Sequence, residues 1–159
     1  MVVLGIDPGA SGGLAWFHQG TVSAKKMPGE EEEILLHLEF LSQLSYPKPP
    51  VCFLEKLTGF VGRPNPGARM FKFGEGYGFL RGVLMTLRWE INSPTPQNWQ
   101  NSLGIGKRGD RSPTEWKRVL KGEAQRLFPS QKVTLATADA LLILKFGLEG
   151  KKINFERPG

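Results

Sequence analysis

The chain has 159 residues, of which 40% are hydrophobic and 23% charged, and this suits one soluble globular domain with a single core. No apolar run approaches the roughly 18 residues that a membrane span requires, so we expect no membrane-spanning segment. The single cysteine, Cys52, excludes an internal disulfide and a thiolate zinc cluster. The first residues lack the basic stretch and cleavage signal of a secretory leader, so we expect an intracellular, cytoplasmic protein.

The net charge of +6 is concentrated in the middle of the chain. Residues 1–60 contain 4 Lys and Arg against 7 Asp and Glu, whereas residues 61–127 contain 12 against 5. Clustered cations favour a polyanionic partner, because they raise both the encounter rate with phosphates and the affinity for them. The alternative, which charge leaves open, is a basic surface without a partner.

The first part of the chain predicts three strands, a helix and a fourth strand. Apolar runs at Val2–Ile6, Gly12–Phe17 and Thr21–Lys25, separated by turns, indicate an antiparallel meander. The segment Glu30–Leu44 is typical of a helix, with acidic residues in its first turn and an apolar face formed by Ile34, Leu35, Leu38 and Leu41. The breaker sequence YPKPP then precedes a second buried strand, Val51–Leu54.

The middle of the chain begins with a segment rich in glycine, proline, arginine and aromatic residues, Gly59–Gly78. We expect this segment to be a mobile loop that leads into a helix ending near Leu87. Next, Trp89–Asn92 predicts a strand and Pro96–Leu103 a short helix. A basic loop follows at Lys107–Arg111.

The last part of the chain predicts two helices. Ser112, with Glu115 three residues later, is a capping-box pattern that opens a helix running to Leu127. The segment Val133–Leu135 predicts either a short strand or a loop. The apolar segment Ala136–Phe146 predicts the final helix, which we expect the following glycine to end.

The order of these elements predicts the fold class. Strands first, and then strands and helices in alternation, indicate an α/β fold with a mixed sheet flanked by helices. The sequence contains no repeat and no linker long enough to divide it, so we expect residues 1–159 to form one domain. The tail from about residue 148 has no evident core contribution and is expected to be peripheral.

Three acidic residues stand in apolar surroundings. Asp7 follows VVLGI, Glu55 follows VCFL, and Asp139 lies in ATADALLIL. Burial deprives a carboxylate of hydration, which is costly unless a positive charge compensates, and carboxylate oxygens suit Mg²⁺ or Mn²⁺. Each residue also has a structural alternative. Asp7 would bond turn amides, Glu55 would pair with a buried Lys or Arg, and Asp139 would be a polar residue at a helix boundary.

The motifs GIDPGASGGLA, FLEK and TADALLI, in this order and spacing, resemble those of the RuvC-type Holliday junction resolvases. The middle segment FGEGYGFLRGVLMTLRWEINSPTPQNWQNSLGI is also similar to that family, in which a glycine-rich helix precedes a strand and a short helix. The run GEGYGFLRGVL and the Phe-Pro before the last acidic motif are especially similar to the plant chloroplast branch. The resemblance covers about residues 1–147 and implies a ribonuclease-H-like fold with a five-stranded mixed sheet.

The resemblance also implies an activity. It implies a homodimer that binds branched DNA, namely a four-way junction, and makes two symmetric nicks with Mg²⁺ or Mn²⁺ as cofactor. By the motif match, Asp7, Glu55 and Asp139 are the catalytic metal ligands. Lys117 resembles a catalytic family lysine near the scissile phosphate, where it would stabilise charge in the transition state. The alternative for Lys117 is a solvated helix face.

The chain departs from the family at the fourth metal ligand, which is normally Asp or His three or four residues before the last Asp. Ala136 and Leu135 occupy these positions here, and neither side chain binds metal. Thr137 is a poor substitute. The departure leaves open weaker activity, a ligand from elsewhere such as Glu75, an engineered inactive form, or a natural pseudo-enzyme.

The family's junction contacts come largely from the loop and helix after the glutamate, where this chain places basic residues between aromatic ones. Such a combination suits a strand that is held by its phosphates and stacked through its bases. The residues predicted to contact DNA, including those of the basic loop, are Arg63, Arg69, Lys72, Phe73, Tyr77, Arg81, Lys107, Arg108 and Arg111. Phe71 lies in the same segment, and the alternative for Phe71 and Phe73 is a place in the core or a dimer interface.

Three other functions stay open at this point. An actin-like kinase or ATPase begins with a similar strand, Asp and Gly turn, but it needs two such domains, for which 159 residues are too few. A nuclease of the same fold that acts on structured RNA fits the motifs as well. A non-catalytic junction-binding protein is the third, and Ala136 motivates it. The prediction we favour is a metal-dependent endonuclease that nicks four-way DNA junctions in pairs.

Overall fold

The computed structural model describes residues 1–57 and 67–151. Its strands form one sheet in the order β3–β2–β1–β4–β5. Neighbouring strands are antiparallel from β3 to β1 and parallel from β1 to β5, so the predicted meander and the predicted five-stranded mixed sheet are confirmed. The strands are β1 (Val3–Asp7), β2 (Gly13–His18), β3 (Thr21–Lys26), β4 (Val51–Leu54) and β5 (Glu90–Asn92).

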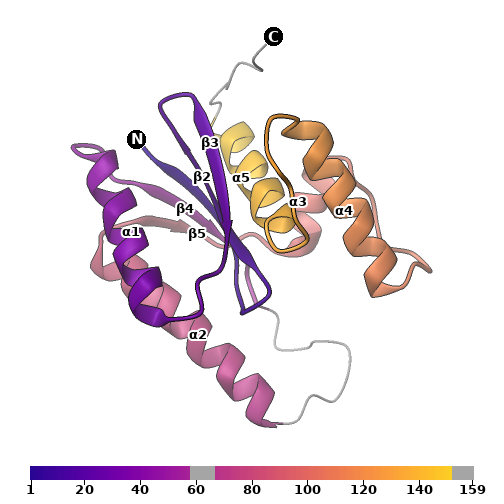
Figure 1. Ribbon diagram of the computed structural model, residues 1–159, viewed down its shortest axis with the longest axis horizontal. Coiled ribbons are helices and arrows are strands. Elements are labelled where there is room, and N and C mark those ends of the chain that lie inside the picture. Colours follow the sequence, from indigo (N-terminus) through magenta and orange to yellow (C-terminus); the bar gives the residue numbers. More distant parts are fainter. Residues whose placement is uncertain (58–66, 152–159) are drawn as a thin grey trace.

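Helices cover both faces of the sheet (Figure 1). One face carries α1 and α2, and the other carries α3, α4 and α5. The helices are α1 (Glu31–Ser45), α2 (Gly67–Thr86), α3 (Pro96–Ser102), α4 (Pro113–Leu127) and α5 (Ala138–Gly150). The capping box predicted for α4 is confirmed, with Ser112 Oγ accepting from the Glu115 amide at 3.2 Å. In the described ranges, no helix has the length and apolar character to cross a membrane.

Side-chain alternation along the two central strands places the acidic residues that follow them. In β1, Val3 belongs to the core under α5, whereas Leu4 and Ile6 belong to the core under α1 and α2. Because successive side chains of a strand point to opposite faces, Asp7 is directed to the α5 side. The same alternation in β4, with Phe53 in the α5 core and Leu54 in the other, directs the next residue to the α5 side as well.

Three glycines let α5 lie directly on the sheet. A Cβ on Gly5 of β1 would stand 2.5 Å from both the Ala140 carbonyl oxygen and the Leu144 nitrogen. At Gly13 a Cβ would meet the Ala136 carbonyl oxygen at 2.4 Å, and at Gly147 it would meet the Phe53 ring at 2.4 Å. The close approach of this helix to β1 and β2 therefore depends on the absence of side chains.

The final helix corrects one expectation. It continues through Gly147 to Gly150, and Leu148 is fully buried, so the peripheral tail predicted from about residue 148 does not include that leucine. Gly147 is required by its contact with the Phe53 ring rather than by a helix end. The segment Val133–Leu135 has no strand, so the loop alternative is confirmed.

Two further expectations differ from the structure. The mobile loop predicted for Gly59–Gly78 is wrong from Gly67 onward, where α2 already begins; residues 58–66 lie outside the described residues. The many glycines of this segment predict a loop, but Phe73 packs on Gly9 of the β1–β2 turn, and this tertiary contact cannot be predicted from the glycine content. Leu35 was assigned to the apolar face of α1 but is 39% exposed, because the buried stripe passes through Ile34 and Leu38.

We expect Gly5→Ala to destabilise the protein by about 1–3 kcal/mol or more, the usual cost of overpacking a core. The new Cβ would meet backbone atoms of α5, which cannot move aside as a flexible side chain can. Urea unfolding followed by circular dichroism measures this difference. The matched control is Gly122→Ala in α4, where a Cβ meets nothing within 4 Å. That control should be neutral or stabilising by up to about 1 kcal/mol, because alanine is the better helix former. Equal effects of the two substitutions would contradict the close packing of α5 on β1.

Candidate metal centre

Asp7 and Glu55 follow neighbouring parallel strands at the same edge of the sheet. Ile6 is paired with Leu54, and the amide of Glu55 donates to the Ile6 carbonyl at 3.1 Å. Gly12 leaves room for Asp7, since a Cβ there would lie 3.1 Å from the Asp7 Cγ. Strand pairing thus carries both carboxylates to one edge, and side-chain alternation turns both to the α5 face.

Asp139 is the third carboxylate, and it lies in the first turn of α5. Its Oδ2 is 3.4 Å from the Nζ of Lys117, which reaches across from α4. The Asp139 side chain is 14% exposed and that of Lys117 is 47% exposed. The helix-boundary alternative for Asp139 describes its position but omits this ion pair. The solvated-face alternative for Lys117 is likewise incomplete, because its ammonium lies over the carboxylate site.

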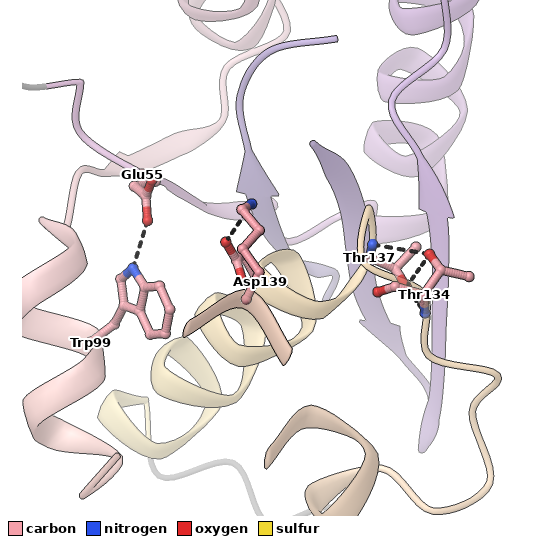
Figure 2. A network of polar contacts seen from close by, with 6 residues as sticks. Glu55, Trp99, Thr134, Thr137 and Asp139 are labelled. Atoms are coloured by element: carbon pink, nitrogen blue, oxygen red, sulfur yellow. Dashed lines mark hydrogen bonds and ion pairs between the residues drawn. The ribbon is translucent and has the colours of Figure 1, made fainter. Parts of the chain in front are cut away.

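Glu55 has a hydrogen-bond partner that the sequence did not reveal. Trp99, which is 1% exposed in α3, donates from its indole Nε1 to Glu55 Oε2 at 2.7 Å (Figure 2). The alternative proposed for Glu55, a buried Lys or Arg partner, is replaced by this indole. The sequence offers one indication of such a bond, because the N–H of a tryptophan buried in the core usually has a hydrogen-bond acceptor.

The three carboxyl groups of the site are buried beside a single ammonium group, that of Lys117. Burial raises the pKa of Asp7 from 3.8 to about 8, and the charges of Asp139 and Glu55 contribute to the rise. Burial also raises the pKa of Glu55 from 4.5 to about 7, against the opposing effect of the Trp99 hydrogen bond. The pKa of Asp139 is raised by burial too, although Lys117 opposes that shift. For Lys117, burial lowers the pKa, but the surrounding carboxylates outweigh burial and the net pKa is raised.

The donor chemistry fits a hard divalent cation, because carboxylate oxygens are the ligands that Mg²⁺ and Mn²⁺ prefer. The side-chain geometry is less complete. Within residues 1–57 and 67–151, no three His, Cys, Asp or Glu side chains lie close enough together to hold one ion. Asp7, Glu55 and Asp139 therefore interact through their charges across the site without forming a finished coordination shell.

Leu135 and Ala136 occupy the positions where the resemblance implies a fourth metal ligand. Ala136 lies at the turn before α5, where its carbonyl closely approaches Gly13. The Thr137 hydroxyl accepts from the Thr134 amide at 3.0 Å and lies 3.1 Å from the Thr134 hydroxyl (Figure 2). The Thr137 hydroxyl therefore stabilises the turn before α5. Glu75, the other substitute considered, is an exposed residue of α2 and lines a separate groove.

Three of the residues predicted to contact DNA share one groove. Arg69, Lys72 and Phe73 of α2 line a groove of about 850 Å³, which Gly9 of the β1–β2 turn lines as well. Its floor is apolar, with Met27, Ile34, Phe79 and Leu80.

The remaining aromatic and basic residues of this segment differ in exposure. Phe71 is 72% exposed, which excludes a place in the core of this chain. Tyr77 packs against the core under α2, whereas Arg81 is exposed. Arg63 lies outside the described residues.

The basic loop before α4 is exposed along its length. Lys107, Arg108 and Arg111 are all exposed, in the segment between α3 and α4. Arg111 also has a structural role, because its Nη1 donates to the carbonyls of Lys107 and Arg108 at 3.4 and 3.3 Å. Its guanidinium lies 5.7 Å from the Trp116 ring centroid, within the range of a cation–π contact. Lys107 and Arg108 are the freer cations of this loop.

Comparison with known proteins identifies the fold. No protein-family model and no curated protein sequence matches the chain. Among solved structures, RuvC of Thermus thermophilus is similar, with a TM-score of 0.57 and 19% identity over 96% of each chain. T. thermophilus RuvC in complex with a Holliday junction substrate is also similar, with a TM-score of 0.57 and 17% identity over 100% of each chain. The predicted α/β ribonuclease-H-like fold is confirmed, whereas the likeness to the plant chloroplast branch stays a prediction.

Without divalent metal, we expect stability to fall as pH rises. Asp7 holds its proton to about pH 8 when folded but to about pH 4 when unfolded, so over this interval the folded state binds more protons. The loss approaches about 1.4 kcal/mol per pH unit for one such group. Melting temperatures in EDTA should therefore fall between pH 5 and about pH 8, and Asp7→Asn should melt higher than the parent at pH 8.

The matched control is Glu39→Gln, which neutralises an exposed carboxylate of α1. It should leave the pH dependence of the melting temperature unchanged. A parent protein that gains stability across this pH interval would contradict the burial of an uncompensated carboxylate at position 7.

Proposed function

We propose that this protein is a structure-selective DNA endonuclease that resolves four-way (Holliday) junctions by paired nicking with Mg²⁺ or Mn²⁺. The observation that carries the proposal is the meeting of Asp7, Glu55 and Asp139 on one side of one sheet edge, with Lys117 above them. Three residues far apart in the sequence share a buried acidic site, in which burial raises the pKa of each carboxyl group. Strongly perturbed pKa values cluster at functional sites.

Each residue has a proposed role. Asp7 and Asp139 would hold the ion, and Glu55 would add a further ligand from the neighbouring strand. A bound divalent cation would supply an activated water and neutralise charge on the phosphodiester. Lys117 is paired with Asp139 in the free protein, and with substrate present its ammonium would stabilise the charge that develops on the phosphate.

The proposed DNA surface combines the α2 groove and the basic loop. Arg69 and Lys72 would hold phosphates beside Phe73, whose ring would stack on a base. Lys107 and Arg108 would contact a second stretch of backbone near α4. The T. thermophilus RuvC complex contains a Holliday junction, which supports a branched substrate for this fold.

Paired nicking requires two sites, so we propose that the active form is a homodimer. The first half of α2 extends beyond the edge of the sheet in Figure 1. On it, the aromatic ring of Phe71 is 72% exposed. Contact between these helices in two copies would cover that ring.

A non-catalytic junction-binding protein is the second candidate, and two observations favour it. Leu135 and Ala136 provide no fourth carboxylate or imidazole in the turn before α5, and the Thr137 hydroxyl is hydrogen-bonded to Thr134. The carboxylates also do not form a finished shell in the described part of the chain. Under this candidate the junction binds, but divalent metal yields no nicks.

We expect Asp7→Asn to lower the rate of junction nicking by roughly 100-fold or more, because it removes a carboxylate from the ion-binding site. Junction affinity should stay within about 2-fold, since Asp7 makes no phosphate contact in the proposal. Nicking of a labelled four-way junction in Mg²⁺ or Mn²⁺ and a gel-shift measurement without metal give the two values. Glu39→Gln is the control and should behave as the parent.

The substrate class is tested with the parent protein on three substrates of matched sequence. We expect paired nicks on the four-way DNA junction and little cleavage of duplex DNA or structured RNA. Preferential cleavage of the RNA would replace this proposal with an RNA nuclease of the same fold. Binding of the junction without any nicks would establish the second candidate instead.

A further inference from the structure

Two hydrogen bonds link the end of β4 to α3 and to the segment just before that helix. The amide of Lys56 donates to the Pro94 carbonyl at 2.8 Å, and Trp99 Nε1 donates to Glu55 Oε2 at 2.7 Å. The first bond fixes the backbone after Glu55, and the second fixes its side chain. The segment before α3 thus restrains the backbone beside Glu55, and α3 itself restrains the Glu55 side chain.

The start of α3 is itself well defined. Thr95 and Asn98 form a reciprocal capping box, with the Asn98 amide donating to Thr95 Oγ1 at 3.2 Å and the Thr95 amide donating to Asn98 Oδ1 at 3.2 Å. Trp99 follows directly, and its ring is buried in the core under α5. Because the ring is fixed by packing, the direction of its N–H is fixed too.

We propose that Trp99 is the positioning residue for Glu55, holding one carboxylate oxygen so that the other is presented to the divalent cation. This inference rests on the proposed function of the site. A carboxylate has two acceptor oxygens, and the bond at 2.7 Å uses Oε2 and leaves Oε1 for a further interaction. Groups that orient a metal ligand from behind commonly change metal affinity by about 10–100-fold when removed.

The chain offers a matched control in a second buried tryptophan. Trp89 is 6% exposed and packs in the core under α1 and α2. Its Nε1 is buried and, among the residues that the structure describes, has no hydrogen-bond partner. Trp99→Phe and Trp89→Phe therefore both shorten a buried indole to a benzene ring, but Trp99→Phe alone removes a donor from Glu55.

Mn²⁺ binding to the DNA-free protein, measured by electron paramagnetic resonance of the free ion, separates the two. We expect Trp99→Phe to weaken Mn²⁺ binding about 10-fold and Trp89→Phe to leave it within about 2-fold of the parent. Equal Mn²⁺ affinity of Trp99→Phe and the parent would overturn the positioning role while leaving the proposed function intact. A parent that binds no Mn²⁺ would instead overturn the proposed function, and the inference with it.

A second measurement needs no change at Trp99 and covers the case in which Trp99→Phe does not fold. In a nitrogen-15 spectrum, the indole resonance of Trp99 should shift on addition of Mg²⁺, with the same midpoint as the amides of Asp7 and Asp139. The Trp89 indole should not move. An unmoved Trp99 indole beside shifting amides at Asp7 and Asp139 would overturn the proposal.

Discussion

Helix α5 lies against the backbone of β1 at Gly5, where an added Cβ would stand 2.5 Å from two backbone atoms of the helix. This contact sets the height of α5 above the sheet, and with it the distance between Asp139 in the first turn of the helix and Asp7 at the end of the strand. Gly13 and Gly147 repeat the same device on β2 and against Phe53 of β4. The site is thus a consequence of how closely a helix packs on a sheet. A larger side chain at any of these glycines would push α5 away from the sheet and so displace Asp139 relative to Asp7.

The carboxylates that this packing brings together are unfavourable for the free protein. Each loses hydration, and Asp7 is also repelled by its two carboxylate neighbours, while one ammonium, that of Lys117, partly offsets the charge. A divalent cation would remove the repulsion and contribute to stability as well as to chemistry. Trp99 belongs to the same balance, because its N–H stabilises the ionised form of Glu55 inside the core.

Part of this organisation could be predicted from one sequence and part could not. Features set by residues close together in the sequence were predicted correctly. The apolar runs predict the antiparallel meander, and Ser112 with Glu115 predicts the start of α4. Asp7 and Glu55 can be predicted because an acid directly after an apolar strand is a local feature of the sequence, and Asp139 because it lies in an apolar helical segment. The predictions fail where a contact between residues far apart in the sequence determines the local structure. In the sequence Gly147 predicts a helix end, whereas in the structure it makes room for the Phe53 ring. The hydrogen bond from Trp99 to Glu55 joins residues 44 positions apart. Leu35 was misplaced because a difference of one residue on a helix turns the side chain from core to solvent.

The central claim is that the three carboxylates share a divalent cation. The most direct measurement is a crystal structure of the protein with Mn²⁺, using anomalous scattering to locate the ion. The account predicts a manganese peak bounded by the carboxylates of Asp7, Glu55 and Asp139, with the Lys117 ammonium displaced from Asp139. An ordered structure in which Lys117 still pairs with Asp139 and no manganese lies among these carboxylates, at a Mn²⁺ concentration well above that used for cutting, would contradict it.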